Sequence, residues 1–136
     1  MRNDLPFQPG RTYPRAILVV DDDPVVCDLV VHQLGGPGVR VLSDYGGAGV
    51  LERLGGDFDV LVLDLQMPDV SGFEVLESLA SRDPRRPLPV VVLTSRSDAD
   101  GIAKAFARGA AAYSLKPVDW PALQRKISEV YMASDR

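Results

Sequence analysis

The sequence predicts an α/β fold, a doubly wound parallel sheet of five strands with helices on both faces, and three observations support this prediction. Short runs of branched apolar residues, such as 17–20 and 60–63, suit strands that are buried on both sides. The segments between these runs carry apolar residues at helical spacing. Strict alternation of strands and helices over 136 residues indicates one domain with right-handed crossovers.

The first half of the chain is expected to contain three strands, over 16–20, 39–42 and 58–63. Asp23 and Pro24 suit the N-cap and the first position of a helix. The apolar face of this helix would comprise Val26, Leu29, Val30 and Leu34. After a turn at Gly46–Gly47, a shorter helix would carry Val50, Leu51 and Leu54 and end at Gly55–Gly56.

The second half is expected to contain strands over 90–93 and 110–115 and three further helices. Ser71 and Glu74 form a capping-box pair that opens the first of these helices, with Phe73, Leu76 and Leu79 on its apolar face. A proline-rich connection, 82–89, follows. Ser97 and Asp100 are predicted to cap the next helix, whose apolar face would be Ile102, Ala105, Phe106 and Gly109. Asp119 would cap a final helix with an apolar face of Leu123, Ile127, Val130 and Tyr131.

These elements define an expected domain over 16–132, between a flexible N-terminal tail, 1–15, and a C-terminal tail, 133–136. The hydrophobic fraction of 46% is sufficient for an ordinary core, and the net charge of −4 argues against direct binding of nucleic-acid phosphates. No apolar stretch approaches the roughly 20 residues that span a bilayer. We therefore expect no contact with membranes. A single cysteine, Cys27, excludes an intrachain disulfide and indicates a reducing compartment, so we expect a cytoplasmic protein. Cys27 and His32 are interpreted as structural helix residues and not as a zinc site.

Polar residues stand directly after the predicted strands. Asp21, Asp22 and Asp23 follow the first strand, Asp64 the third, Thr94 and Ser95 the fourth, and Lys116 the fifth. The carboxyl ends of parallel strands meet at one edge of the sheet, which is where such folds bind ligands. Each residue alone has a structural interpretation: for Asp23 an N-cap is the main one, Thr94 would be a structural hydroxyl, and Lys116 a surface lysine. Together, they predict one site.

This set of side chains supports phosphoryl transfer to a carboxylate. Asp22 and Asp64, with Asp21 nearby, provide the few carboxylates that Mg²⁺ uses in proteins, and the metal would offset the repulsion between a carboxylate and a phosphoryl group. Asp64 would be the nucleophile and form an acyl phosphate. Lys116 and the Thr94 hydroxyl would bind phosphoryl oxygens.

The chain closely resembles the receiver domain of two-component response regulators, over about 16–132. The matching stretches are 17–24, Asp64 to Pro68 and on to Gly72, Thr94–Ser95, Gly109–Ala110 to Tyr113, and Lys116–Pro117. The resemblance implies a flavodoxin-like, chemotaxis-receiver-like (βα)5 fold with strand order 2-1-3-4-5. It also implies a phosphorelay switch and not an enzyme that turns over an external substrate.

By this resemblance, Asp64 accepts the phosphoryl group from a histidine kinase or a histidine phosphotransfer protein. Asp21, Asp22, Asp64 and the backbone carbonyl of Gln66 would hold Mg²⁺, or Mn²⁺ in its place. Thr94 and Lys116 would bind the phosphoryl group, with a cis bond from Lys116 to Pro117.

The resemblance also implies a conformational switch. Phosphorylation adds a charge of about −1.5 to −2, toward which Thr94 moves while Tyr113 changes rotamer. The responding surface would span about 98–132, and Gln66 and Arg96 stand where family members vary and tune dephosphorylation. A downstream output protein or a fused output domain would read this surface, from a monomer or a phosphorylation-dependent homodimer. Only five residues follow Tyr131, so we expect either a stand-alone receiver or a piece of a longer protein.

Two other functions compete with this one. A receiver-like module could bind partners independently of phosphorylation, although the complete set of acids, Thr94 and Lys116 argues against it. A phosphatase of the haloacid-dehalogenase type also uses an aspartate at a strand end with Mg²⁺. Its nucleophile is followed two residues later by a second acid, whereas Gln66 occupies that position here. A dinucleotide-binding domain would need a glycine triplet after the first strand, which is absent.

Overall fold

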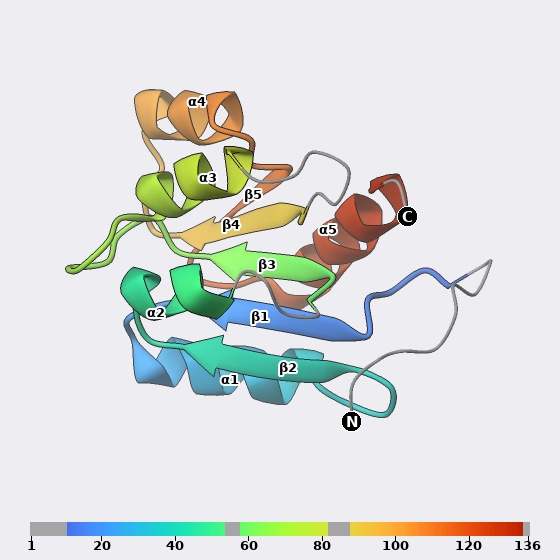
Figure 1. The fold of residues 1–136 in the computed structure, drawn as a ribbon. Helices are drawn as coiled ribbons and strands as arrows, with labels where there is room; N and C mark the ends of the chain where they lie inside the picture. The colour runs from blue at the N-terminus through green and yellow to red at the C-terminus, as the bar shows by residue number, and fades with distance from the viewer. Residues whose placement is uncertain (1–10, 54–57, 82–87, 135–136) are drawn as a thin grey trace.

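The five strands form one parallel sheet in the order β2-β1-β3-β4-β5 (Figure 1), in a computed structural model that describes residues 11–53, 58–81 and 88–134. The predicted fold class and strand order are confirmed. The strands are β1 (Ala16–Val20), β2 (Arg40–Asp44), β3 (Val60–Leu63), β4 (Val90–Thr94) and β5 (Ala112–Leu115). The predicted glycine end of the second helix and most of the proline-rich connection lie outside the described residues.

The continuous apolar runs of β1, β3 and β4 are buried along their whole length, as their composition predicted. β3 and β5 begin two residues later than predicted, since the preceding residues join the sheet through single backbone bonds, from Asp59 N to Ala16 O and from Ala111 N to Val90 O. The register brings the strand ends together: Val20 pairs with Leu63 of β3. The residues that follow these strands therefore emerge side by side.

The helices are α1 (Pro24–Leu34), α2 (Gly47–Arg53), α3 (Gly72–Ala80), α4 (Ala99–Ala107) and α5 (Trp120–Ala133). The predicted caps Asp23 and Asp119 and the capping box at the start of α3 are confirmed. The predicted cap of α4 is wrong by one residue, because the cap is Asp98. Its carboxylate accepts from Gly101 N at 2.9 Å and also pairs with Arg96, whereas a Ser97 hydroxyl could not form an ion pair.

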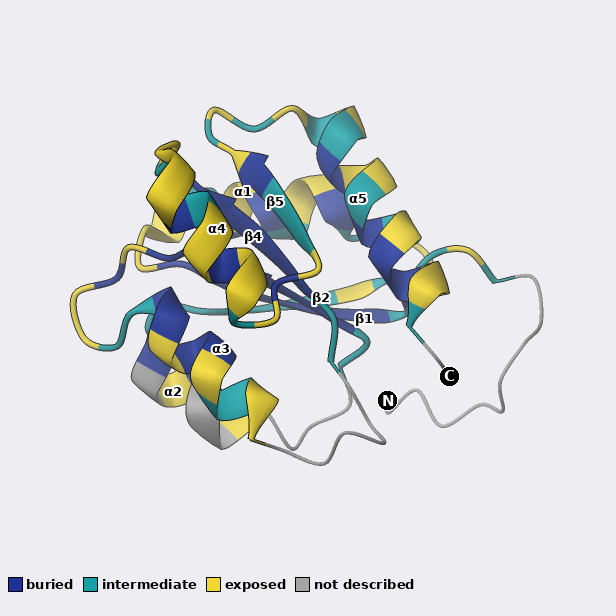
Figure 2. Cartoon of the chain, turned by 90° about the horizontal axis from the view of Figure 1, so that it is seen from above, coloured by how far each residue is buried: buried dark blue, intermediate teal, exposed yellow. Residues whose placement is uncertain are grey.

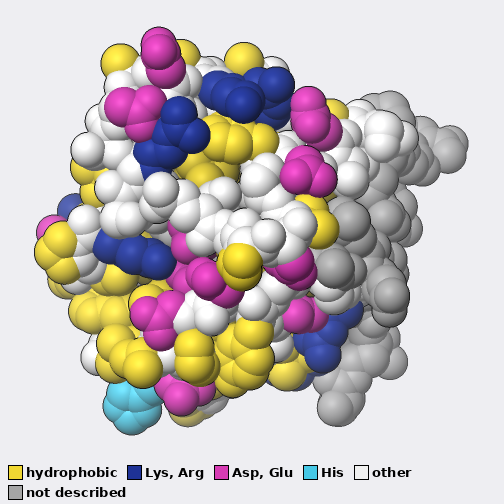
Figure 3. Space-filling model, turned by 90° about the vertical axis from the view of Figure 1, so that its left-hand side faces the viewer, with side chains coloured by type: hydrophobic (Ala, Val, Ile, Leu, Met, Phe, Trp, Pro, Cys, Tyr) yellow, Lys and Arg dark blue, Asp and Glu magenta, His cyan; other side chains and the backbone are white. Residues whose placement is uncertain are grey.

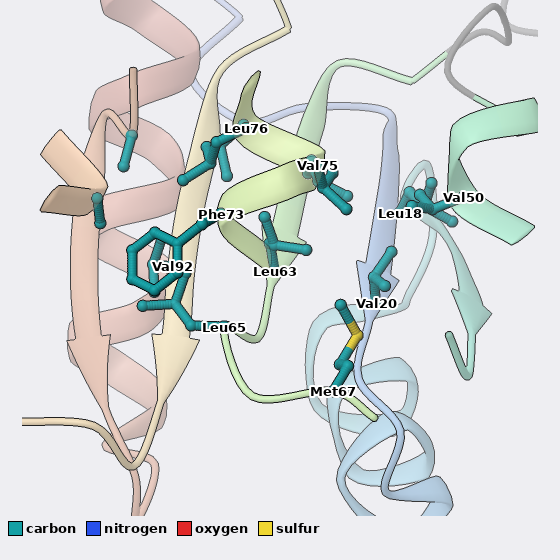
Figure 4. Packing of buried hydrophobic residues seen from close by; sticks show 14 residues of the cluster. Leu18, Val20, Val50, Leu63, Leu65, Met67, Phe73, Val75, Leu76 and Val92 are labelled. Carbon is teal, nitrogen blue, oxygen red and sulfur yellow. The ribbon is translucent and has the colours of Figure 1, made fainter. Parts of the chain in front are cut away.

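Helices cover both faces of the sheet (Figures 1 and 2). α2, α3 and α4 pack on one face, where Val50, Phe73 and Ala105 join a core with residues of β1, β3 and β4; Figure 4 shows this core. α1 and α5 pack on the other face, where Val30, Leu34, Leu123, Ile127, Val130 and Tyr131 meet the alternate strand residues. The apolar face predicted for the last helix is therefore confirmed.

Two helices are turned relative to their predicted apolar faces. α1 buries Cys27 together with Val30 and Leu34, which leaves Leu29 47% exposed. α4 buries Gly101 and Ala105, and Phe106 is 46% exposed. In α1, the small side chain of Cys27 lies on the buried face, whereas in α4 the prediction was right for Ala105 and wrong for Phe106. A spacing pattern does not show how closely each helix approaches the sheet.

The described part of the expected N-terminal tail is anchored. Ser128 Oγ of α5 donates to Thr12 O at 2.6 Å, and Arg11 Nη2 donates to Gly38 O at 3.1 Å. Tyr13 packs against the core beneath α5, and burial raises its pKa to about 12. Residues 11–15 thus lie against the domain. Among the helices described, none combines the length and the hydrophobicity that a membrane span needs.

Replacing Gly72 with alanine should destabilise the fold. A Cβ at this position would lie 2.7 Å from Leu65 Cα and would also meet the Asp64 carbonyl, so backbone that carries the site would have to move. We expect a loss of about 1–3 kcal/mol in the free energy of unfolding, measured by urea denaturation. Gly36→Ala is the matched control because its Cβ would meet nothing within 4 Å. Equal stability of the two variants would contradict the close packing at Gly72.

The Cys27 thiol should be protected in the folded protein. Burial raises its pKa to about 11 from an ordinary value of 9.0, and Cys27 Sγ donates to Asp21 O at 3.2 Å. Because folding favours the neutral thiol, its contribution to stability is complete below pH 9 and is lost as the pH rises toward 11. Iodoacetamide at pH 8 should modify the native chain far more slowly than the urea-unfolded chain, as followed by mass spectrometry. Equal rates would contradict this burial.

Candidate functional site

The predicted site residues meet at the edge formed by the carboxyl ends of the strands. Asp21 and Asp22 follow β1, Asp64 follows β3, Thr94 ends β4 and Lys116 follows β5. Figure 3 looks onto this edge, with acidic side chains gathered near its centre and a basic one beside them. The parallel sheet therefore brings together side chains that are up to 95 positions apart in the sequence, as for Asp21 and Lys116.

Three carboxylates form the acidic cluster of this site. Asp21, Asp22 and Asp64 each place one oxygen within 4.8 Å of the others, a spacing that could hold a metal ion. Asp21 and Asp64 are buried, with exposed fractions of 1% and 5%, whereas Asp22 is exposed. An arrangement of two buried acids and one open acid leaves the cluster accessible from solvent through Asp22, which suits a hard cation that keeps several waters.

The two buried carboxylates are held in the same way. Asp21 Oδ1 accepts from Asp23 N at 2.9 Å, and Asp64 Oδ1 accepts from Gln66 N at 3.2 Å. Each carboxylate therefore uses one oxygen to fix the turn after its strand. The Oδ2 atoms of both residues turn toward Lys116, so that local backbone bonds and one distant lysine determine their orientation.

Lys116 is the cation of the site. Its Nζ lies 2.7 Å from Asp21 Oδ2 and 3.5 Å from Asp64 Oδ2. The backbone of Lys116 is fixed by its N–H, which donates to Thr94 O at 2.9 Å, and the bond to Pro117 is cis, as expected. One ammonium thus faces two buried carboxylates and offsets part of their negative charge.

Burial and charge oppose each other in this pair. Burial raises the pKa of Asp21, and the charge on Asp64 adds to the rise, although the hydrogen bonds from Lys116 and Asp23 N counteract it. Burial acts to lower the pKa of Lys116, but the hydrogen bond to Asp21 and the charges of Asp64 and Asp21 raise it overall. Lys116 therefore stays protonated and can attract an incoming anion.

Thr94 and Tyr113 both form hydrogen bonds with the backbone of Arg96, in the loop that follows β4. Thr94 is fully buried, and its Oγ1 accepts from Arg96 N at 3.4 Å. Tyr113 OH donates to Arg96 O at 2.7 Å, while Lys126 Nζ donates to Tyr113 O at 2.6 Å. The two residues expected to switch are thus connected through the backbone of Arg96.

Some contacts around the site were not predicted from the sequence. Ser95 Oγ donates to Gln66 Oε1 at 3.0 Å and joins the loops after β3 and β4. The guanidinium of Arg96 pairs with Asp98 and lies over the ring of Phe73 at 5.4 Å. Only the pair of Arg96 and Asp98, two positions apart, left a signal in the sequence. The other contacts join residues more than twenty positions apart, and the one between Arg96 and Phe73 depends on how α3 packs.

The comparisons with known proteins agree with this geometry. A sequence model of the family described as the response regulator receiver domain matches residues 17–128. The transcriptional regulatory protein ZraR of Klebsiella oxytoca is 35% identical over 114 residues, which are 83% of this chain and 25% of the relative. Protein-glutamate methylesterase/protein-glutamine glutaminase 6 of Anaeromyxobacter dehalogenans is 42% identical over 111 residues, 79% of this chain and 31% of the relative.

A solved structure shares the whole fold. The response regulator protein TrrA of Thermotoga maritima, solved in complex with Mg²⁺ and BeF, is 26% identical, with a TM-score of 0.75 over 85% of this chain and 98% of that chain. By contrast, the chain spans only between about a fifth and a third of the curated relatives that it matches. The similarity therefore concerns one domain of those longer proteins.

Proposed function

Because the chain belongs to the response regulator receiver domain family, we propose that it accepts a phosphoryl group on Asp64 and thereby switches a protein-binding surface. It is a receiver domain of two-component response regulators, a family whose standard function is switching by phosphorylation. One observation above all supports Asp64 as the acceptor. Its carboxylate is buried at a strand end, beside Asp21, Asp22 and the ammonium of Lys116.

The residues around Asp64 suggest how transfer proceeds. A carboxylate oxygen of Asp64 attacks the phosphorus of a phosphohistidine, the new P–O bond forms as the P–N bond breaks, and the imidazole leaves after taking a proton from solvent. Lys116 Nζ, 3.5 Å from Asp64 Oδ2, would pair with a phosphoryl oxygen. The Thr94 hydroxyl, whose oxygen accepts from Arg96 N, would donate its hydrogen to another phosphoryl oxygen.

Asp21, Asp22, Asp64 and the backbone carbonyl of Gln66 would hold Mg²⁺, or Mn²⁺. The donor set fits, because all the ligands are oxygens and three carboxylates lie within 4.8 Å. The ion would neutralise charge on the phosphoryl group during transfer. The solved structure of TrrA is a complex with Mg²⁺ and BeF, and this supports the same use of the site here. In this chain, Asp22 is the exposed acid through which the ion would reach the two buried ones.

We infer that the chain is a switch and not an enzyme acting on an external substrate. The methylesterase named among its relatives is a longer protein, of which this chain matches 31%. The donor would be a histidine kinase or histidine phosphotransfer protein in the cytoplasm. The reader would be an output protein or a fused output domain, approached by a monomer or a phosphorylation-dependent homodimer. The net charge of −4 argues against direct contact with nucleic acid.

A module that binds partners without phosphorylation is the second candidate. It would need the fold and the exposed surface but not the acidic cluster or Lys116. The two candidates therefore differ in one result, which is whether Asp64 becomes phosphorylated.

Incubation with acetyl phosphate and Mg²⁺ should add one phosphoryl group, detected by intact mass. Asp64→Asn should add none, because an amide oxygen is a poor nucleophile and cannot form the acyl phosphate. Omitting Mg²⁺ should abolish the gain in the unmodified chain. Asp119→Asn is the matched control, since Asp119 is an exposed aspartate that caps α5, and asparagine preserves the cap. If the chain gains no mass while a known receiver is labelled, the binding module is favoured instead.

Removing Asp22 should weaken metal binding without unfolding the chain. Asp22 is exposed, and its side chain forms no hydrogen bond with the described backbone. Asp22→Asn should therefore have the same melting temperature as the unmodified chain. Calorimetric titration should show an affinity for Mg²⁺ that is reduced by about tenfold or more, because one of the three carboxylate ligands has lost its charge. Asp119→Asn again serves as the control and should bind as the unmodified chain does. Equal affinity of Asp22→Asn and the unmodified chain would contradict the proposed ligand set.

A further inference from the structure

The loop from Ser95 to Asp98 is the direct covalent link between the site and α4. Thr94 ends β4 beside the acidic cluster, and α4 begins at Ala99. Any displacement of Thr94 must therefore reach α4 through these four residues or through their neighbours. The side chains of this loop make specific contacts with other elements, and those of Arg96 are the most extensive.

Arg96 is bound to the start of α4. Its Nε lies 2.7 Å from Asp98 Oδ1, and its Nη2 donates to Asp98 Oδ2 at 3.2 Å, so the guanidinium and the carboxylate form a two-point pair. Asp98 Oδ2 also accepts from Gly101 N at 2.9 Å. These hydrogen bonds lower the pKa of Asp98 to about 2, the bond from Arg96 having the larger effect. Arg96 and the N-cap of α4 are thus one hydrogen-bonded unit.

Packing fixes the same side chain from two further sides. A Cβ on Gly101 would lie 2.9 Å from both Cδ and Cζ of Arg96 and still closer to Nε, so the arginine lies directly against the backbone of α4. On the other side, its guanidinium faces the ring of Phe73 in α3 at 5.4 Å. Lys104 of α4 and Arg108, the residue that caps the end of α4, face the same ring, at 4.4 and 5.9 Å. Figure 3 shows basic and hydrophobic side chains together at the top of the site face, where Figure 1 places α3 and α4.

The backbone of Arg96 is bound to the switching residues. Its N–H donates to Thr94 Oγ1 at 3.4 Å, the hydroxyl that would turn to a phosphoryl group. Its carbonyl accepts from Tyr113 OH at 2.7 Å. One residue therefore contacts Thr94 and Tyr113 through its main chain, and α4 and α3 through its side chain.

We propose that Arg96 is a positioning residue whose side chain couples the phosphoryl site to α4, through its pair with Asp98 and its packing on Gly101 and Phe73. This inference rests on the proposed function of Asp64. When Thr94 is drawn toward the phosphoryl group, the main chain at Arg96 moves, and its guanidinium carries the cap of α4 with it. Without the side chain, the four-residue loop can absorb the displacement by changes in its own torsion angles.

Thermodynamic linkage gives this proposal a specific signature. If binding at the site must also move α4, part of the binding free energy is used for that movement. A variant that uncouples the two events no longer bears this cost. It should bind a phosphoryl analogue at least as tightly as the unmodified chain while α4 responds less. A variant that merely damages the fold would bind the analogue more weakly.

The test uses beryllium trifluoride with Mg²⁺ as the phosphoryl analogue and amide chemical shifts as the readout. Each variant of the full chain is titrated, and shifts of residues 99–107 are compared with those of the loop after Asp64. Arg96→Ala removes the side chain. Asp98→Asn removes the charge but preserves the N-cap of α4. Arg96→Lys keeps a charge but not the planar two-point pair. Arg108→Ala is the matched control, because Arg108 also faces Phe73 but pairs with Glu77, at 3.1 Å, away from the loop.

The unmodified chain should bind the analogue and show large shifts in α4. In Arg96→Ala and Asp98→Asn, the shifts in α4 should fall at least threefold, while the dissociation constant stays within twofold or becomes tighter. Arg96→Lys should lie between, and Arg108→Ala should match the unmodified chain. Unchanged α4 shifts in both loop variants, or an equal loss of shifts in Arg108→Ala, would overturn the coupling role of Arg96 and leave the proposed function standing. Failure of the unmodified chain to bind the analogue would overturn the proposed function and this inference with it.

Discussion

The ion pair between Lys116 and Asp21 joins the ends of β5 and β1, the last and the first strands in chain order. Its 2.7 Å contact, with Asp64 3.5 Å from the same ammonium, keeps two carboxylates buried side by side. Without this cation, burial and the charge of Asp64 would favour the neutral form of Asp21 by raising its pKa further, and a neutral acid binds a metal poorly. The site therefore depends on a lysine that only the completed sheet can deliver, so folding and chemical competence are coupled.

The parallel sheet meets this requirement because its strands end in register. Val20 pairs with Leu63, so Asp21 and Asp64 leave neighbouring strands at the same level. Burial of both faces of the central strands makes this register costly to change. The close approach of Gly72 to the backbone after β3 then fixes the loop that carries Asp64. A sheet with both faces of its central strands buried thus carries the loops that hold the site residues.

The fold and the members of the site could be predicted from the sequence because both follow from local pattern. Apolar runs followed by acids, a hydroxyl and an amine identify strand ends, and parallel topology places those ends together. The phase of α1, in which Leu29 is exposed, could not be predicted because it depends on how closely the helix packs. The contact of Arg96 with Phe73 depends on how α3 packs against the loop, which no spacing reveals. The cap at Asp98 in place of Ser97 reflects the local ion pair with Arg96, two positions away, which the capping pattern did not take into account.

Chemical trapping would identify the aspartate that carries the phosphoryl group, which we propose to be Asp64. Borohydride reduces an acyl phosphate to an alcohol, which converts phosphoaspartate to homoserine. After treatment with acetyl phosphate and Mg²⁺, peptide mass spectrometry should find homoserine at position 64 and aspartate at positions 21 and 22. Homoserine at either of those two positions would contradict the assignment of nucleophile and metal ligands, and its absence throughout would contradict phosphorylation itself.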